Sequence, residues 1–486
     1  MDLDPGTATA TELTGALRRR TVSSRELLDA LLRRVEREHP RLNAVVALDV
    51  DRARREAADA DDRAARGEFD GPLHGLPMTV KDVWETEGLV TTSGAPWLAD
   101  HVPATDAVAV GRLRSAGAIV FGKTNTPLLA GDFQTYNEVY GTTNNPWDVT
   151  RTPGGSSGGA AAAVAAGLTP LELGSDIGGS IRGPAHFTGI YGLKPSWGVV
   201  PTRGHIPGPP GSLVEADVNC NGPLARSVED LRLGLGVVAG PLPEEAVGWR
   251  LELDPGPPVD DVAGLRVATV FGEGSDLIPV AADVRARLDG FAGRLAAAGA
   301  RVEPVELPVP LADGLRSWQD LVVPIIGSGL PPADYDAFKG LDELPGDDPM
   351  TVAARAIAGR YRAWARADQR RQLQRQAWSA LFDRWDVVLA PVMPTAAFVH
   401  DIDRPITDRV LDVDGTPVPH LLAMAWCGAV GSVLLPVVTL PTGRTPTGLP
   451  VGVQVIGPFL SDRRLLAIAK VIDAAAGSGF IPPPAG

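Results

Sequence analysis

The sequence predicts an α/β protein, because short buried strands alternate with helices over its central part. From about residue 71 to 240, apolar runs such as Ala118-Ile119-Val120-Phe121 are separated by turns rich in Gly, Pro and Asn, a texture typical of buried strands. The 486 residues, of which 44% are hydrophobic and 21% charged, can also bury a large core. We therefore expect a globular protein with a signature-bearing core at residues 71–240.

Helical regions are predicted on both sides of this core. Residues 1–66 are interpreted as N-terminal helices, two of them amphipathic, the second starting soon after Pro40; a capping box of Ser23 and Glu26 is placed at the end of the first. Residues 310–382 are mainly helical and are interpreted as an insertion or pocket wall. Further strands are predicted at residues 265–271, 302–307, 387–389, 433–435 and 451–456, and further helices at residues 281–298 and 461–475.

Charge and composition argue against several functional classes. The net charge of -14 disfavours a nucleic-acid partner, since such binders concentrate Lys and Arg on one face. The acidic N-terminus has no apolar signal region, and no run approaches about 18 apolar residues, so we expect a cytoplasmic protein without membrane contact. Cys220 and Cys427 are far apart and are expected to be core thiols rather than a disulfide or metal ligands.

Residues 117–124 fit the spacing G-x-x-x-x-G-K-[ST] of a phosphate-binding loop. The four intervening residues are β-branched, aromatic or Ala and favour a strand, whereas a phosphate cradle needs a loop at those positions. Pro127 also disfavours the helix that should follow at once. We therefore reject nucleotide hydrolysis.

Residues 154–158 fit G-x-S-x-G, the turn that exposes a nucleophilic serine in α/β-hydrolases. That turn follows a central strand, but residues 146–153 contain two prolines, which would break a sheet ladder. Ser156 as a nucleophile with His400 or His420 as its base is therefore the less favoured hypothesis.

Three separated segments, taken together, are far more specific. They are residues 75–82 (GLPMTVKD), 154–159 (GGSSGG) and 174–182 (GSDIGGSIR). In combination they resemble the amidase signature family. Supporting stretches lie at residues 122–125, 145–147, 192–195 and 448–454, so the resemblance runs from about residue 10 to 475 and is densest from 71 to 231. It implies one α/β domain, a mixed twisted sheet covered by helices on both faces, with a helical insertion.

Ser180 is the predicted nucleophile. It follows two glycines and opens a predicted helix, so its backbone can turn sharply and a carbonyl carbon can approach its hydroxyl. The backbone N–H groups of Ile177, Gly178, Gly179 and Ser180 could then converge on an oxyanion. Each such donor is worth about 3 kcal/mol of the barrier.

A serine hydroxyl needs a base, and Lys81 is the predicted one. It lies in an apolar segment, residues 76–83, where burial would lower a pKa that starts near about 10.4 and produce a neutral amine. If structural instead, Lys81 would be paired with Asp82 or Asp176. His74 and His186 are expected to be polar or structural residues, with substrate contact by His186 as the alternative.

Further roles are implied by the resemblance alone. Ser156 would bridge Lys81 and Ser180 as a proton relay and would follow a cis peptide bond. The residues expected to support the two glycine loops are Ser157, Asp176 and Arg182. The expected reaction requires no metal and no cofactor.

The resemblance implies an amidase, and we predict a small-molecule amide as substrate. Acyl-enzyme chemistry does not distinguish an amide from a carbamate (urethane) or an aryl ester, so these stay open. The predicted pocket walls carry little charge at residues 426–432, which points to an apolar or aromatic substrate; the other walls are residues 128–140, 203–220 and 310–345. The expected partners are that substrate and, at most, a second copy of the chain, as a monomer or homodimer.

Two alternatives belong to other classes. One branch of the family is the glutamine-hydrolysing subunit of a tRNA-dependent amidotransferase complex. Residues 204–211 (GHIPGPPG) stand where we would expect a Ser-Ser-Leu-Asp type of segment in that branch, so it is the less favoured hypothesis. A non-enzymatic binding protein would have lost Lys81, Ser156 or Ser180, and all three are present.

Overall fold

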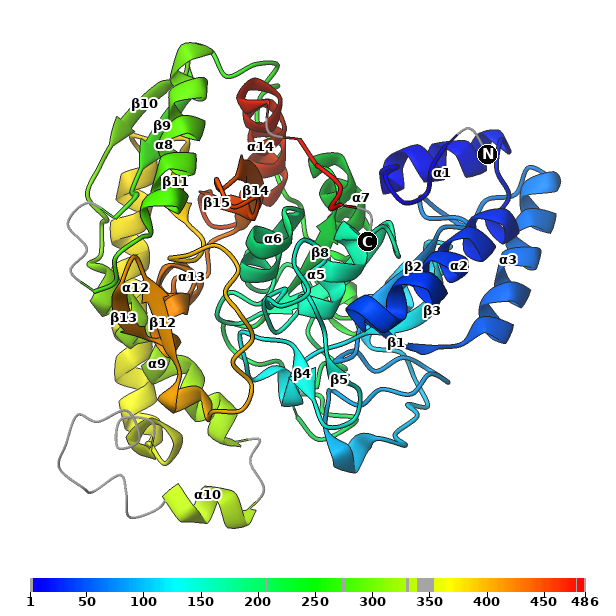
Figure 1. Ribbon diagram of the computed structural model, residues 1–486, viewed down its shortest axis with the longest axis horizontal. Coiled ribbons are helices and arrows are strands. Elements are labelled where there is room, and N and C mark those ends of the chain that lie inside the picture. The colour runs from blue at the N-terminus through cyan, green and yellow to red at the C-terminus, as the bar shows by residue number, and fades with distance from the viewer. Residues whose placement is uncertain are drawn as a thin grey trace.

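The computed structural model describes residues 3–206, 208–272, 277–328, 332–338, 354–477 and 479–484. Over these residues, eleven strands form one sheet in the order β1-β3-β2-β6-β8-β7-β14-β15-β11-β9-β10 (Figure 1). The strands are β1 Val45–Leu48, β2 Pro77–Lys81, β3 Ile119–Thr124, β6 Leu171–Asp176, β7 Tyr191–Lys194, β8 Cys220–Ala225, β9 Arg266–Thr269, β10 Arg301–Pro304, β11 Val387–Pro391, β14 Val437–Arg444 and β15 Pro450–Ile456. Two short hairpins pair β4 Tyr136–Asn137 with β5 Gly141–Thr142, and β12 Val410–Val413 with β13 Thr416–Pro419.

Helices flank the sheet along its whole width. The α-helices are α1 Ala10–Arg19, α2 Ser24–Leu42, α3 Val50–Ala65, α4 Val108–Ser115, α5 Gly158–Ala165, α6 Arg182–Thr188, α7 Val228–Val238, α8 Ala282–Ala297, α9 Leu311–Ser328, α10 Pro332–Phe338, α12 Tyr361–Phe382, α13 Ala425–Ser432 and α14 Asp462–Ala476. No helix among the described residues combines the length and the apolar character needed to cross a bilayer.

The sheet is mixed, and its parallel part positions the site. β2 lies between β3 and β6 and runs parallel to both. β6 then pairs antiparallel with β8. Because parallel neighbours end at the same edge of a sheet, Lys81 at the end of β2 and Asp176 at the end of β6 lie at one edge.

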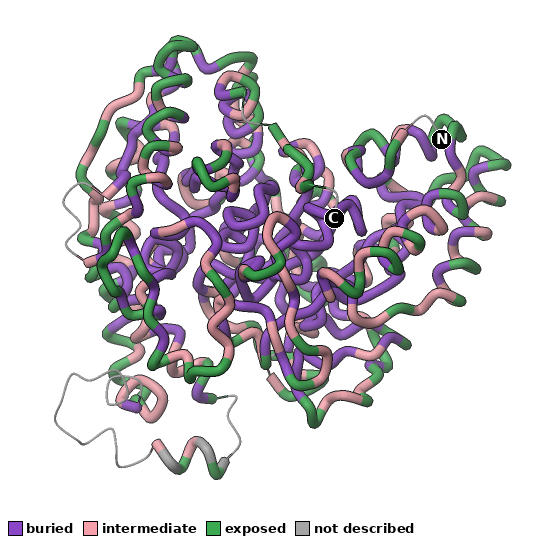
Figure 2. Tube along the Cα trace, in the orientation of Figure 1, coloured by how far each residue is buried: buried purple, intermediate pink, exposed green. Residues whose placement is uncertain are grey.

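Side-chain alternation in the sheet explains why both of its faces are covered. Leu224 of β8 packs into a cluster with α5 and α6. Leu171, the end residue of β6, lies on the other face against Gly234 of α7, and α7 packs with α14 and through it with α8. α5 is buried over its whole length, and Figure 2 shows the buried chain concentrated between the two helical layers. The predicted mixed sheet covered by helices on both faces is confirmed.

The N-terminal region differs from the prediction. It contains three helices, α1 to α3, with strand β1 between the last two, and Pro40 lies inside α2 rather than before a new helix. Ser23 accepts from the backbone of Glu26 and forms a capping box that begins α2. A capping box marks a helix N-terminus, so placing it at the end of the first helix was wrong.

The predicted strand at residues 433–435 is also wrong. These residues connect α13 to β14, which starts at Val437. Leu434 has a φ of 69°, a left-handed conformation incompatible with an extended strand. An apolar run alone therefore indicated burial but not backbone shape.

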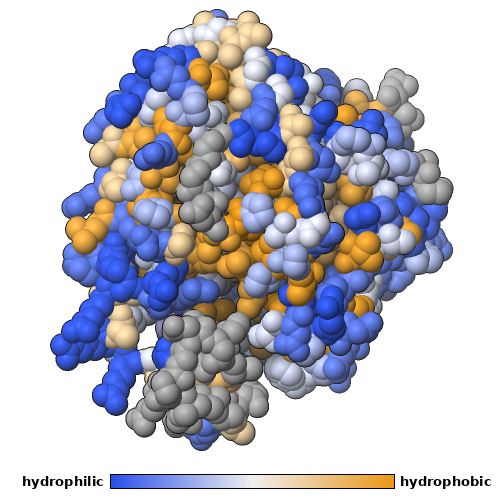
Figure 3. All heavy atoms as spheres, turned by 60° about the vertical axis from the view of Figure 1, so that its left-hand side comes forward, coloured by the Kyte–Doolittle hydropathy of each residue, from blue (hydrophilic) through white to orange (hydrophobic). Residues whose placement is uncertain are grey.

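The helical insertion packs as a layer on the far side of the active-site loops. α9 lies against α13, and α12 lies against α9; Gly314 of α9 approaches Ala429 so closely that a Cβ would lie 2.7 Å from the Ala429 Cβ. The part of this predicted insertion at residues 329–331 and 339–353 lies outside the described residues. On this side of the molecule, hydrophobic atoms gather near the centre and hydrophilic ones around them (Figure 3).

Candidate active site

Lys81 is the last residue of β2, and its side chain is fully buried. Its Nζ lies 2.6 Å from Ser156 Oγ and 3.0 Å from Ser175 Oγ. Neither Asp82 nor Asp176 is its hydrogen-bond partner, unlike the structural alternative considered above. Burial lowers the pKa of Lys81 to about 7, against the opposing effect of nearby carboxyl groups.

Ser156 and Ser157 lie in the loop that leads into α5. The peptide bond between Gly155 and Ser156 is cis. Thr126 Oγ1 donates to the Ser156 carbonyl at 3.1 Å, and Ser157 Oγ donates to the Ser175 carbonyl at 3.2 Å. These bonds attach the first glycine loop to the ends of β3 and β6.

Ser180 lies between β6 and α6 and is 5% exposed. The Ser157 N–H donates to the Ser180 carbonyl at 3.1 Å, so the two glycine loops lie side by side. Among the described residues, no hydrogen bond joins Ser156 Oγ to Ser180 Oγ. The Lys81 and Ser156 side chains are thus in direct contact, whereas Ser180 is joined to that pair through backbone.

The predicted oxyanion amides divide into two groups. The N–H of Gly179 donates to Asp176 Oδ1 at 2.8 Å, so it is engaged within the loop. The N–H groups of Ile177, Gly178 and Ser180 have no hydrogen-bond acceptor among the described residues. These three amides, and not Gly179, are free to meet a ligand oxygen.

Asp176 and Arg182 form a fully buried ion pair beneath this loop. Arg182 Nε and Nη2 donate to the two Asp176 oxygens at 3.0 and 2.8 Å. Arg182 Nη1 donates to the Cys427 carbonyl and to Gln454 Oε1. Burial alone would raise the pKa of the Asp176 carboxyl, but the Arg182 guanidinium holds it well below its ordinary value. The pair connects the second glycine loop to α13 and β15.

Glu172 and Ser175, both in β6, are site residues that sequence reasoning missed. Glu172 accepts hydrogen bonds from the hydroxyl groups of Thr79 and Thr124. Burial raises the pKa of Glu172 to about 8, so it is largely protonated at neutral pH. An acidic residue inside the apolar strand Leu171–Asp176 was the signal that could have identified it, since unpaired buried carboxylates are rare.

The segment that resembled a phosphate-binding loop is strand β3, as predicted. Lys123 is fully buried, and its Nζ donates to the Trp84 carbonyl and to the hydroxyl groups of Thr86 and Thr91. Asp82 lies 4.0 Å from the same Nζ. Lys123 is therefore enclosed by protein groups and does not face a phosphate.

The histidines considered above lie elsewhere or are held by backbone. Both ring nitrogens of His186 meet backbone groups, of Gly452 and Thr395, and burial lowers its pKa to about 4. His400 meets Asn144, and His420 packs between Phe133 and Phe398; His74 spans Asp70 and Ala60.

The predicted pocket walls lie at different distances from the reacting groups. The Asp132 carbonyl packs against Gly155, and Cys427 packs against Gly179. The half-buried His205 ring meets Trp84 edge to face; Pro207 in the same predicted wall lies outside the described residues.

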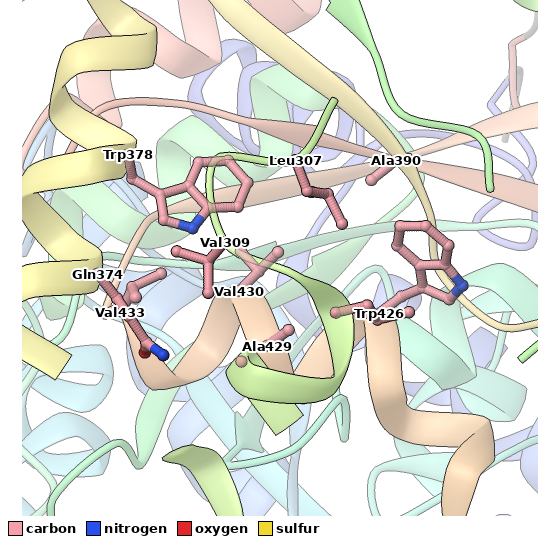
Figure 4. A pocket seen from close by; sticks show the side chains of 11 residues that line it. Leu307, Val309, Gln374, Trp378, Ala390, Trp426, Ala429, Val430 and Val433 are labelled. Carbon is pink, nitrogen blue, oxygen red and sulfur yellow. The ribbon is translucent and has the colours of Figure 1, made fainter. Parts of the chain in front are cut away.

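Trp426, which was expected to line the substrate site, instead borders a small apolar cavity between α9, α12 and α13 (Figure 4). Trp378 lies at the other end of the view, and no predicted catalytic side chain lines this cavity. It belongs to the packing of the insertion.

Comparisons with known proteins agree with this fold and these loops. The sequence profile of the family named Amidase matches residues 26–316 and 349–466. One subunit of the glutamyl-tRNA(Gln) amidotransferase of Synechococcus sp. (strain CC9605) is 35% identical, over 94% of each chain. A bacterial aryl acylamidase of the amidase signature enzymes has a TM-score of 0.82 at 26% identity, covering 97% of this chain and 96% of its own. The amidotransferase subunit of the same name from Thermotoga maritima has a TM-score of 0.77 at 25% identity, covering all of both chains.

The fold and these matches define an enzyme that acts on amide C–N bonds. The chain belongs to the amidase signature family, as the three glycine-rich segments indicated.

The expected stand-alone hydrolysis of a small apolar amide needs correction. Over nearly its full length, the chain matches a curated protein named as one subunit of a tRNA-dependent amidotransferase. The expected partners, a small-molecule substrate and at most a second copy, without nucleic acid, are corrected by the same finding. The difference at residues 204–211, which had disfavoured this branch, covers a single loop, whereas the similarity extends over the whole chain.

Proposed function

We propose that this chain is the glutamine-hydrolysing subunit of a glutamyl-tRNA(Gln) amidotransferase. The full-length similarity to proteins named as amidotransferase subunits supports the assignment to this branch. The observation that carries the chemistry is the 2.6 Å contact between Lys81 Nζ and Ser156 Oγ. It joins a buried amine of lowered pKa to a hydroxyl at the base of the Ser180 loop.

Lys81 is the proposed general base. With a pKa of about 7, a large share of its amine is neutral at neutral pH. A neutral amine has two N–H groups and one lone pair, so it can donate to Ser175 Oγ and accept the hydroxyl proton of Ser156. Ser156 can then accept the proton of Ser180 once the substrate brings the two hydroxyls together.

The proposed cycle begins when Ser180 Oγ attacks the side-chain carbonyl carbon of glutamine, while its proton passes through Ser156 to Lys81. The oxyanion is met by the free amides of residues 177, 178 and 180. The C–N bond breaks, the nitrogen takes the proton back, and ammonia leaves. Water, deprotonated by the same relay, hydrolyses the glutamyl ester, releasing glutamate and restoring Ser180. Ser157, Asp176 and Arg182 hold the two loops in place.

The test is glutamine-dependent conversion of Glu-tRNA(Gln) to Gln-tRNA(Gln). The chain is co-expressed with the remaining amidotransferase subunits of its own genome, and the purified complex is assayed for ammonia release and amide transfer. We expect both activities in the wild type and the loss of both in Ser180→Ala, with the complex intact. Ser227→Ala, which removes a helix N-cap on α7, is the matched control and should retain both.

Two outcomes would overturn the proposal. One is a folded chain that forms no complex with those subunits. The other is a complex that releases no ammonia from glutamine although the isolated chain cleaves other amides or carbamates.

A further inference from the structure

A tryptophan from the helical insertion reaches the loop that precedes Ser180. Trp318 of α9 is 8% exposed, and its indole Nε1 donates to the carbonyl of Ile177 at 2.6 Å. The ring also covers Gly178, where an added Cβ would lie 2.9 Å from Trp318 Cζ2. Trp318 is 141 residues away from Ile177 in sequence, so no local pattern indicated this contact.

This hydrogen bond sets the direction of an amide that has no partner. A peptide unit is planar and trans, so its C=O and N–H point in opposite directions. The unit between Ile177 and Gly178 presents its C=O to Trp318, and its N–H therefore points away from α9. The Gly178 N–H is one of the three free amides of the loop.

The other peptide units of the loop are fixed by groups close in sequence. The Gly179 carbonyl accepts from the Gly183 N–H at 2.7 Å, which in the same way directs the Ser180 N–H. The Gly179 N–H is held by Asp176. For the unit that carries the Gly178 N–H, the anchor is Trp318.

We propose that Trp318 is a positioning residue of the reaction: by holding the Ile177 carbonyl, it aims the Gly178 N–H at the oxyanion. The inference rests on the proposed acyl-enzyme at Ser180 and assigns a role in that step to the insertion. Because a preorganised donor acts without reorientation at the moment of reaction, loss of the indole N–H weakens binding of the transition state and leaves binding of the substrate unchanged.

The chain offers a matched control for the indole bond. Trp364 of α12 donates its Nε1 to the Leu321 carbonyl of α9 at 3.2 Å. Trp318→Phe and Trp364→Phe therefore each remove one indole N–H bond to a backbone carbonyl of or beside α9, and only the first concerns the glycine loop.

The experiment measures kcat and KM for glutamine in the assembled complex, together with the rate at which a fluorophosphonate labels Ser180. For Trp318→Phe we expect kcat and the labelling rate to fall about 10-fold, less than the 10²–10³ of a fully lost donor, with KM within about two-fold. Trp364→Phe should change none of the three by more than about two-fold. Thermal unfolding of both variants reports whether each is folded.

Unchanged kcat and labelling in folded Trp318→Phe would overturn the inference. A rise in KM alone would also overturn it, since the indole would then be only a wall of the pocket. If Trp318→Phe does not fold, benzothienylalanine at position 318 keeps the ring shape and lacks the N–H, and the same expectations apply. Labelling of wild-type Ser180 without glutamine turnover would contradict the proposed function, and the labelling rates would still decide the role of Trp318.

Discussion

Two buried lysines lie on neighbouring strands and differ in the groups around them. Lys81 meets the hydroxyls of Ser156 and Ser175, which can give and take protons. Lys123 meets a carbonyl oxygen and two threonine hydroxyls near Asp82, which suits a fixed cation. Burial lowers the pKa of both, to about 7 and about 8. Their partners, more than their burial, distinguish a proposed base from a structural charge.

The lowered pKa of Lys81 predicts the pH dependence of the reaction. The neutral amine is the active form, so kcat/KM for glutamine should rise as pH increases through about 7 and level off above it. Lys81→Arg should be inactive at every pH, because a guanidinium stays protonated. The measurement is a pH–rate profile across neutral pH, within the range in which the complex stays folded. A flat profile, or activity in folded Lys81→Arg, would contradict the role of Lys81.

At the scale of elements, α5 is unusual in consisting almost entirely of Gly and Ala. Its residues are all buried, and an added Cβ at Gly159 would lie 2.4 Å from the backbone N of Asn125. Small residues therefore let this helix lie directly against the end of β3. Since Ser156 and Ser157 lead into α5, the same close approach places them beside Lys81.

Gly159→Ala tests this packing. The methyl group meets backbone that cannot move aside, so we expect a loss of about 1–3 kcal/mol in the free energy of unfolding and a large fall in kcat. Gly236→Ala is the control, because Gly236 is an exposed residue of α7 with nothing within 4 Å of an added Cβ; it should be neutral or stabilising by up to about 1 kcal/mol. Urea unfolding and glutamine turnover are measured for both. Equal effects of the two substitutions would count against the packing argument.

Over the whole molecule, one continuous apolar core joins the two ends of the chain. The main cluster of buried side chains extends from Ala8 to Ala476. The N-terminal segment is also held by two buried charged groups: Arg226 donates to the Ala8 carbonyl, and Asp230 accepts from the N–H of Ala10 at 2.9 Å. The first helix is thus part of the packed core.

Deleting residues 1–20 should lower the midpoint of thermal unfolding of the entire chain in a single transition. The deletion leaves Arg226 and Asp230 without these partners, and unpaired buried charges are costly. Calorimetry of the truncated chain is compared with that of a chain lacking residues 482–486, whose described side chains lie at the surface. An unchanged midpoint, or two separate transitions, would contradict a continuous core.

Much of this architecture could be predicted from the sequence, because residue type constrains the backbone locally. The apolar run ending in Phe121 predicted a strand, and the double glycines before Ser180 predicted a sharp turn into a helix. Helix boundaries near Pro40 and the backbone at Leu434 were missed, since packing overrides local preference there. The branch of the family was also missed, because one divergent loop received more weight than similarity along the whole chain.

The sequence was sufficient for the mixed sheet, the family and the three segments that carry Lys81, Ser156 and Ser180, because each depends on residues adjacent in the chain. Only the folded chain decides which groups meet: Lys81 contacts Ser175 instead of Asp82, the Gly179 amide is taken by Asp176, and Trp318 holds the Ile177 carbonyl. Hydrogen-bond partners of this kind come from elements far apart in the chain, and their pairing depends on how helices and sheet pack together.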